Sequence, residues 1–206
     1  MADCSDSARA LGPDGPLAAR LEGYVARASQ QQMAARIEAA LHAPSVFIAE
    51  SGTGTGKTFA YLVPALLSGK KLLISTGTKN LQDQLYERDL PFVRDALEIP
   101  VSYALLKGRA NYLCLHRLER AGLEDRFATG ELAAALRTVE TWAGRTRRGD
   151  IAEVGEVPED SALWPQLTST ADNCLGSHCH RYEDCFVNRA RREALAADVL
   201  AVNHHL

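Results

Sequence analysis

The stretch of the chain best suited to chemistry is a run of small residues that ends in a lysine and a threonine. Small side chains let successive backbone N–H groups turn toward one anion, and a helix that begins near Lys57 adds its positive N-terminal end. Lys57 can reach the outer phosphates of a nucleotide, and the Thr58 hydroxyl falls where such loops hold Mg²⁺. The pattern predicts a nucleotide triphosphate site in which Lys57 and Thr58 are the catalytic members and the phosphate loop is Ser51, Gly52, Thr53, Gly54, Thr55, Gly56, Lys57 and Thr58.

Four of the five cysteines form a second candidate site. The set is Cys114, Cys174, Cys179 and Cys185: 59 residues lie between the first and the second, four between the second and the third, and five between the third and the fourth. Structural zinc sites usually contain a tight Cys-x-x-Cys pair, which this sequence lacks, so the looser spacing favours a 4Fe-4S cluster held by four thiolates. Zinc stays an alternative because His178 and His180 flank Cys179 and could replace a cysteine; a set that binds no metal is the third.

Both sites need elements that position them. Apolar runs of strand type precede the loop and recur downstream, at 45–49, 71–76, 101–106 and 198–202. Helical spacing covers 30–41, a helix follows the loop from 58, and another covers 79–88. This alternation predicts an α/β fold with a parallel sheet covered by helices on both faces.

The pattern divides the chain into four parts. Residues 1–22 are glycine- and proline-rich and are predicted to form a flexible leader. Residues 23–107 form the first part of the nucleotide-binding domain, and 108–190, which lack a clear strand pattern, form a mainly helical insertion with the cysteines. Residues 191–206 return to the first domain.

Composition limits the class of protein. With 206 residues and 46% hydrophobic content, the chain can bury a core, and a formal net charge of −3 argues against coating nucleic acid by bulk charge. The polar N-terminus resembles no secretory signal, and no apolar run approaches the roughly 20 residues that span a bilayer. We therefore expect a cytoplasmic protein without a membrane partner, whose cysteines are metal ligands rather than disulfides.

Several stretches together resemble the DinG/YoaA type of iron-sulfur DNA helicase, which is related to the XPD helicase of superfamily 2. Arg27-Ala28-Ser29-Gln30 resembles the Q motif, which implies that Arg27 and Gln30 recognise the adenine nucleotide and that the nucleotide is ATP. The stretch 74–85 resembles motif Ia, which implies contacts of Thr76, Thr78 and Gln82 with the phosphates of single-stranded DNA. The stretch 107–114 resembles the entry to the family's cluster domain, and the other three cysteines match its remaining ligands.

The resemblance implies the RecA-like version of the α/β fold and a monomeric 5′–3′ helicase that couples ATP hydrolysis to unwinding in repair or replication. Its implied partners are single-stranded DNA, DNA junctions and a replication or repair protein. The stretch 197–206 resembles the one just ahead of the family's Asp-Glu-x-His box, and because this box lies beyond Leu206, we expect the chain alone to be inactive. The alternatives are a nucleotide-, DNA- or partner-binding module without turnover, and an unrelated P-loop ATPase or kinase with a zinc insertion.

Overall fold

The computed structural model describes residues 5–43, 45–52, 54–124 and 130–204, which form two units. The first unit comprises the described residues up to Ala104 together with Ala197–Val202, and the second comprises Leu105–Ala196 and continues from Asn203. The segment 191–196, which we assigned to the first domain, therefore belongs to the second unit. None of the described helices is long and apolar enough to cross a membrane.

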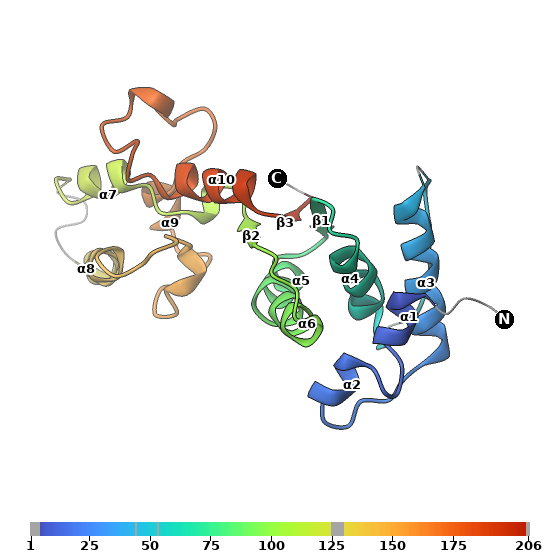
Figure 1. Cartoon of the computed structure of the whole chain (residues 1–206). Helices are drawn as coiled ribbons and strands as arrows, with labels where there is room; N and C mark the ends of the chain where they lie inside the picture. The colour runs from blue at the N-terminus through green and yellow to red at the C-terminus, as the bar shows by residue number, and fades with distance from the viewer. Residues whose placement is uncertain (1–4, 44, 53, 125–129, 205–206) are drawn as a thin grey trace. The chain divides into compact units, whose positions relative to one another are not determined.

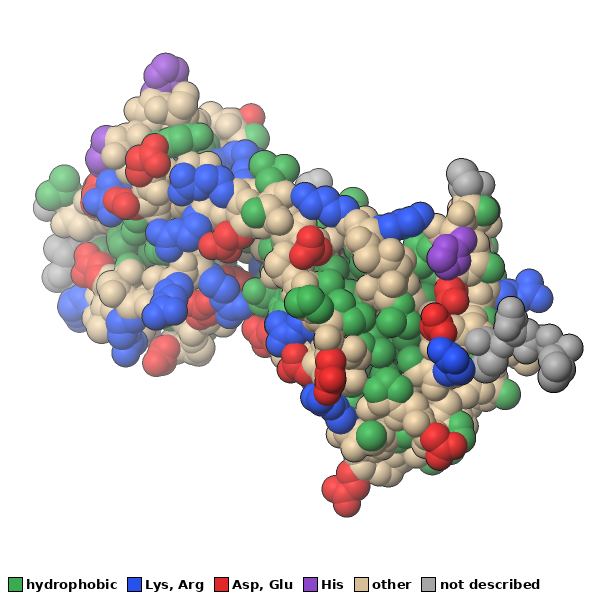
Figure 2. Space-filling model, in the orientation of Figure 1, with side chains coloured by type: hydrophobic (Ala, Val, Ile, Leu, Met, Phe, Trp, Pro, Cys, Tyr) green, Lys and Arg blue, Asp and Glu red, His purple; other side chains and the backbone are tan. Residues whose placement is uncertain are grey.

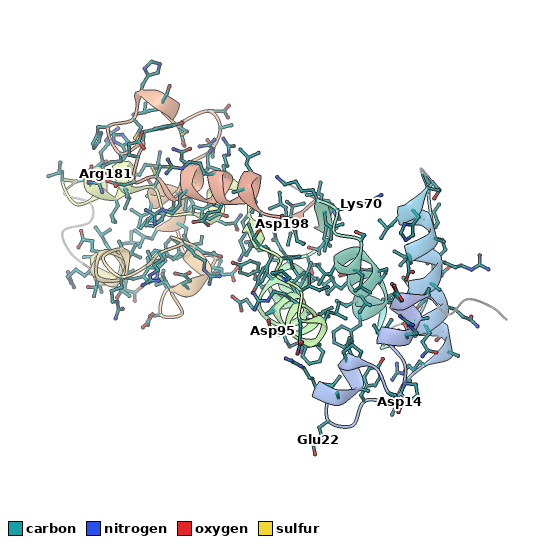
Figure 3. The ribbon with its side chains drawn as sticks, in the orientation of Figure 1. Asp14, Glu22, Lys70, Asp95, Arg181 and Asp198 are labelled. Carbon is teal, nitrogen blue, oxygen red and sulfur yellow. The ribbon has the colours of Figure 1, made fainter. Side chains whose placement is uncertain are left out.

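A three-stranded parallel sheet organises the first unit (Figure 1). Its strands are β1 (Leu72–Thr76), β2 (Tyr103–Leu106) and β3 (Val199–Asn203), and β3 lies between the other two. The Asp198 carboxylate fixes the register beside β3, because it accepts hydrogen bonds from the backbone N–H (2.9 Å) and hydroxyl (2.7 Å) of Ser102 (Figure 3). The α/β class predicted from the alternating pattern is present.

The segment 45–49, predicted to be the strand before the phosphate loop, has no strand structure in its described residues. Its apolar side chains stand in solvent, with Val46 90% and Ile48 89% exposed. A strand is defined by hydrogen bonds to a neighbouring strand, and the three-stranded sheet of the described residues provides none for this segment. The apolar pattern therefore identified a sheet-forming sequence, but not a strand of this sheet.

Residues 5–22 differ from the predicted flexible leader. They form two short helices, α1 (Asp6–Ala10) and α2 (Pro16–Arg20), and Ser5 caps the first by accepting a hydrogen bond from Ala8 N. Leu11 and Leu17 are completely buried. The turn signals were correct, but the leucines between them supply enough apolar surface to fix the segment against α3 (Ala28–His42).

The remaining helices of the first unit follow the loop and the first strand. Helix α4 (Lys57–Leu67) packs against α3 and α6 (Leu90–Leu97), and Phe59 of α4 stacks on Phe92 of α6 with ring centroids 5.4 Å apart. Between β1 and α6 lie α5 (Lys79–Gln84) and a π-helical turn (Leu85–Asp89). Figure 2 shows hydrophobic side chains exposed on one face of this unit.

The second unit is mainly helical, as predicted. It contains α7 (Leu115–Ala121), α8 (Gly130–Ala143), α9 (Trp164–Leu167) and α10 (Phe186–Ala196), joined by long loops with 3-10 turns. Trp142, Trp164 and Phe186 belong to one buried cluster. Within this unit, Lys107 forms a buried ion pair with Asp150 (Nζ–Oδ2 2.7 Å).

Candidate functional site

The phosphate loop bends through two glycines in the left-handed backbone region, Gly54 (φ 72°) and Gly56 (φ 82°). Helix α4 begins at Lys57, immediately after Gly56, so the helix N-terminus faces the end of the loop. The Lys57 ammonium donates hydrogen bonds to the carbonyl oxygens of Ser51 and Gly52, each at 2.6 Å. Thr53, which we predicted to be part of the site, lies outside the described residues.

Two further side chains stabilise the loop or lie at its end. The Thr55 hydroxyl donates to the Gly52 carbonyl oxygen at 2.9 Å and contacts the Ser51 hydroxyl. Thr58 lies on the first turn of α4 beside Tyr61, whose pKa is raised by burial, with a hydrogen bond from Thr58 opposing that rise. Hydrogen bonds within the loop therefore hold its shape, in addition to its direct connection to α4.

Gln30 joins α3 to the phosphate loop. Its side chain is only 5% exposed, and its Nε2 donates a hydrogen bond to the Gly56 carbonyl oxygen at 2.9 Å. The Tyr24 hydroxyl lies 3.4 Å from Gln30 Oε1 and also donates to the Leu11 carbonyl oxygen at 2.9 Å. A Cβ atom at Gly56 would lie 2.3 Å from Gln30 Nε2, so this contact requires glycine.

Arg27 reaches the same loop from the residue before α3. Its guanidinium Nη1 donates to the Gly54 carbonyl oxygen, while most of the side chain is exposed. Gln30, Ser51, Thr55 and Lys57 also line a cavity of about 130 Å³. Residues that we assigned to ATP on separate grounds thus lie together in one unit.

The three residues predicted to contact DNA differ from one another in exposure. Thr76 ends β1, and the Thr78 hydroxyl caps α5 by accepting a hydrogen bond from Leu81 N at 3.2 Å. Gln82 is completely buried, and its Nε2 donates to the carbonyl oxygen of Ala201 on β3 at 3.3 Å. Gln82 therefore holds α5 against the sheet, and only the exposed Thr78 and the partly exposed Thr76 can meet a ligand.

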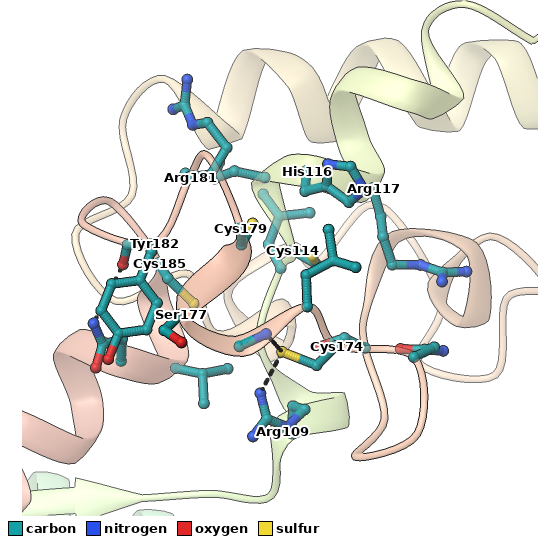
Figure 4. Close-up of a pocket in the computed structure, with 18 of the residues that line it drawn as sticks. Arg109, Cys114, His116, Arg117, Cys174, Ser177, Cys179, Arg181, Tyr182 and Cys185 are labelled. Carbon is teal, nitrogen blue, oxygen red and sulfur yellow. Dashed lines mark hydrogen bonds between the residues drawn. The ribbon is translucent and has the colours of Figure 1, made fainter.

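The four predicted cysteine ligands line one cavity of about 320 Å³ in the second unit (Figure 4). Cys114 is the residue before α7, and Cys185 is the residue before α10. Cys174 and Cys179 lie on the two sides of the 3-10 turn Gly176–His178. All four are free thiols of intermediate burial, so the fold brings together the distant Cys114 and the three clustered cysteines.

Positive and N–H groups surround the sulfur atoms. Arg109 Nη1 donates to Cys174 Sγ at 2.9 Å, and the backbone N–H of Gly176 donates to the same sulfur at 3.4 Å. Arg117, Arg181 and Arg191 also line the cavity. Cationic neighbours and hydrogen bonds stabilise thiolates, the form in which cysteine binds metal.

The thiols themselves are close enough to interact. Burial raises the pKa of the Cys114 thiol, and the charges of Cys185 and Cys179 raise it further. A cation among the thiolates would remove this repulsion. The donor set, the shared cavity and the basic lining therefore fit an iron-sulfur cluster.

The sequence analysis missed His116. A ligand atom of this residue lies within 4.8 Å of those of Cys179 and His180, and the three donors lie within that distance of one another. His116 is on the first turn of α7, and its ring contacts the His180 ring edge-on, with centroids 5.2 Å apart. Its position two residues after Cys114 was the only signal available from the sequence.

Comparison with known proteins gives a family for part of the chain. A model described as "DEAD/DEAH box helicase" matches residues 27–124. The chain is 50% identical over 196 residues to the ATP-dependent DNA helicase YoaA of Escherichia coli, covering 95% of this chain and 31% of that protein. It is 35% identical to the ATP-dependent helicase DinG of Mycobacterium tuberculosis (89% of this chain, 31% of that protein).

A third relative is named for a different activity. The "3'-5' exonuclease DinG" of Bacillus subtilis is 31% identical over 95% of this chain and 21% of that protein. The chain thus spans about a third or less of the length of these curated relatives. The matched segment contains Gln30, the phosphate loop, β1 and Cys114. Residues 27–124 thus match the DEAD/DEAH box helicase model, in a chain that is similar to YoaA and DinG.

Proposed function

We propose that this chain is the nucleotide-binding and cluster-binding part of an ATP-dependent DNA helicase. The observation that supports the proposal is the hydrogen bond from Gln30 to Gly56, because Gln30 belongs to the stretch that resembles the Q motif and Gly56 is the last loop residue before α4. The 50% identity to YoaA supports unwinding as the activity. No feature of the described residues supports the 3′–5′ exonuclease activity for which one relative is named.

In this mechanism each loop residue has its own task. Lys57 exchanges the carbonyl oxygens of Ser51 and Gly52 for oxygens of the outer phosphates. The Thr58 hydroxyl is a ligand of Mg²⁺, and the backbone N–H groups at the start of α4 bind phosphate. Arg27 and Gln30 recognise the adenine nucleotide beside the loop. Exposed Thr78 and partly exposed Thr76 bind backbone phosphates of single-stranded DNA.

Nucleotide binding is tested by titrating Mg·ATP into the chain. Lys57→Ala removes a charge-assisted interaction of about 1.5–3 kcal/mol, so we expect the Kd to rise about ten- to a hundredfold. Lys70→Ala is the matched control, since Lys70 is exposed, belongs to the same unit and donates to the Leu41 carbonyl oxygen away from the loop. Gln30→Ala should reduce the preference for ATP over GTP. Equal Kd values for wild type and Lys57→Ala would overturn the assignment of the loop.

We further propose that Cys114, Cys174, Cys179 and Cys185 hold a 4Fe-4S cluster. When bound, this group cross-links four chain segments and can carry an electron. Arg109 and the Gly176 N–H would then stabilise the Cys174 thiolate. The support is the shared cavity, the basic lining and the match to the family's ligand spacing.

Anaerobic purification tests the cluster. Wild type should contain about four iron atoms per chain, as four-cysteine cubes do. Cys179→Ser should lose most of this iron, whereas Cys4→Ser, which changes the one cysteine outside the set, should retain it. Protein that takes up no iron under reconstitution would overturn the proposal.

A further inference from the structure

The second unit contains a three-donor group that the proposed cluster uses only in part. His116, Cys179 and His180 have ligand atoms within 4.8 Å of one another. His116 belongs to α7, while Cys179 and His180 follow the turn Gly176–His178, so the group joins two segments. Cys179 is shared with the cluster set, and the two histidines are not.

The spacing of this group suits one small ion. A tetrahedral zinc ion with bonds of about 2.0–2.3 Å places its ligand atoms about 3.3–3.8 Å apart, so donors that lie within 4.8 Å of one another need to approach by about 1 Å or a little more to bind it. A cube has a different requirement, because each of its cysteines binds a different iron atom. His116, Cys179 and His180 together offer two nitrogen donors and one sulfur donor, a mixed set of the kind that zinc accepts.

Glu119 supports one of the histidines from outside. Its Oε2 lies 2.8 Å from His180 Nε2, which leaves the other ring nitrogen of His180 for an ion. Its Oε1 pairs with Arg181 Nη1 at 3.1 Å, so the carboxylate is itself held in place. A carboxylate bonded to the remote ring nitrogen is the usual second partner of a zinc-binding histidine.

His116 provides an independent observation. Its Nδ1 is buried and has no hydrogen-bond partner among the described residues. Buried polar atoms are normally satisfied, and an orphan on a histidine beside a thiol and a second histidine is explained by a ligand. Figure 4 shows His116 next to Cys179 at the edge of the same cavity.

We propose that His116, Cys179 and His180 bind a zinc-class divalent ion when the chain lacks its cluster. Because Cys179 belongs to both sets, the ion and the cluster exclude one another, and zinc blocks cluster assembly. The claim that zinc blocks cluster assembly depends on the proposed cluster, whereas the claim that the three residues bind an ion does not. The site would therefore make assembly sensitive to the ratio of zinc to iron.

Cobalt(II) is a suitable optical probe, because its absorption reports thiolate and tetrahedral coordination. Cluster-free protein should bind about one Co²⁺ with a thiolate charge-transfer band, and zinc should displace it. His116→Ala and Cys179→Ser should weaken binding at least tenfold, while Cys114→Ser and the matched control His178→Ala should leave it within twofold. Circular dichroism and a thermal scan identify any variant that fails to fold. If His116→Ala fails to fold, His180→Ala, which changes an exposed side chain, takes its place in the test.

The iron content of the variants distinguishes a failure of the zinc site from a failure of the proposed cluster. His116→Ala/His180→Ala should still assemble iron, and zinc added before iron should inhibit assembly in wild type but not in this double variant. If Cys114→Ser abolishes Co²⁺ binding as strongly as His116→Ala does, the ion uses the cluster cysteines and the inference is wrong. If Co²⁺ binds as described but no iron is taken up, the cluster proposal fails and the ion site stands.

Discussion

The side-chain amide of Gln30 donates a hydrogen bond to the carbonyl oxygen of Gly56, and this bond connects α3 to the last residue before α4. It couples the residue assigned to adenine with the loop assigned to phosphate. The close approach is possible because Gly56 has no Cβ and adopts a left-handed conformation.

Gly56→Ala should therefore cost both stability and ATP binding. The left-handed backbone alone costs about 1–2 kcal/mol for alanine, and the new methyl group would displace Gln30. We expect a loss of about 2–4 kcal/mol in the free energy of unfolding, measured by urea denaturation. Gly69→Ala is the matched control, since Gly69 also has positive φ (62°) but nothing within 4 Å of an added Cβ. Equal losses for the two variants would show that the Gln30 contact is unimportant.

The Arg109–Cys174 hydrogen bond should tune the reduction potential of the proposed cluster. Removing a donor from a ligating sulfur leaves more negative charge on it and makes reduction harder. Arg109→Met should lower the reduction potential and speed iron loss in air, measured by redox titration and by absorbance decay. Arg120→Met, at an exposed position of α7, is the control. An unchanged potential in Arg109→Met would contradict a role for this bond.

The Lys107–Asp150 pair should be sensitive to the loss of one partner. Both side chains are less than 10% exposed, so a single deletion leaves a buried charge. We expect Lys107→Met or Asp150→Leu alone to cost about 3–5 kcal/mol, whereas Lys107→Met/Asp150→Leu should recover much of this loss. Thermal unfolding of the four proteins in the double-mutant cycle measures the coupling. Additive losses would show that the two residues act independently.

The Asp198–Ser102 contact predicts a pH dependence. Hydrogen bonds from the hydroxyl and then the backbone N–H of Ser102 lower the pKa of the Asp198 carboxyl in the folded protein. A lowered pKa contributes stability above the unfolded value of about 3.9, and this stability is lost as the pH falls through the folded pKa. Asp198→Asn should thus be less stable than wild type at pH 7, and the difference should shrink below about pH 4. Asp14→Asn, at an exposed turn, should show neither effect; a difference that persists at low pH would contradict the assignment.

Local pattern predicted much of the fold. Strands β1, β2 and β3 and helix α3 begin and end close to the expected residues, and α4 begins within one residue of its expected start, because apolar periodicity acts over a few positions. The segment 45–49 differed, since a strand depends on a partner elsewhere in the chain. The N-terminal helices were missed because burial of Leu11 and Leu17 depends on contacts with residues far away in sequence.

For the candidate sites, too, residues close in sequence could be predicted, whereas contacts between distant segments could not. The phosphate loop is contiguous, so its residues could be predicted together, and the cysteines could be grouped by type and count. Gln82 has a buried side chain that bonds to Ala201, a partner 119 residues away, and no local pattern reports this. His116 could not be singled out because its donor group forms only when α7 meets the turn at Cys179.

The first helices of the chain also bear on nucleotide selection at a distance. The Leu11 carbonyl oxygen, which lies between α1 and α2, accepts hydrogen bonds from the Tyr24 hydroxyl and from Gln31 Nε2 (3.2 Å). Gln31 follows Gln30 in the sequence, and the Tyr24 hydroxyl lies 3.4 Å from Gln30 Oε1. We therefore expect trimming or fusing the N-terminus to alter the discrimination between purine bases that we propose for Gln30, although the described residues of α1 and α2 do not line the cavity at the loop.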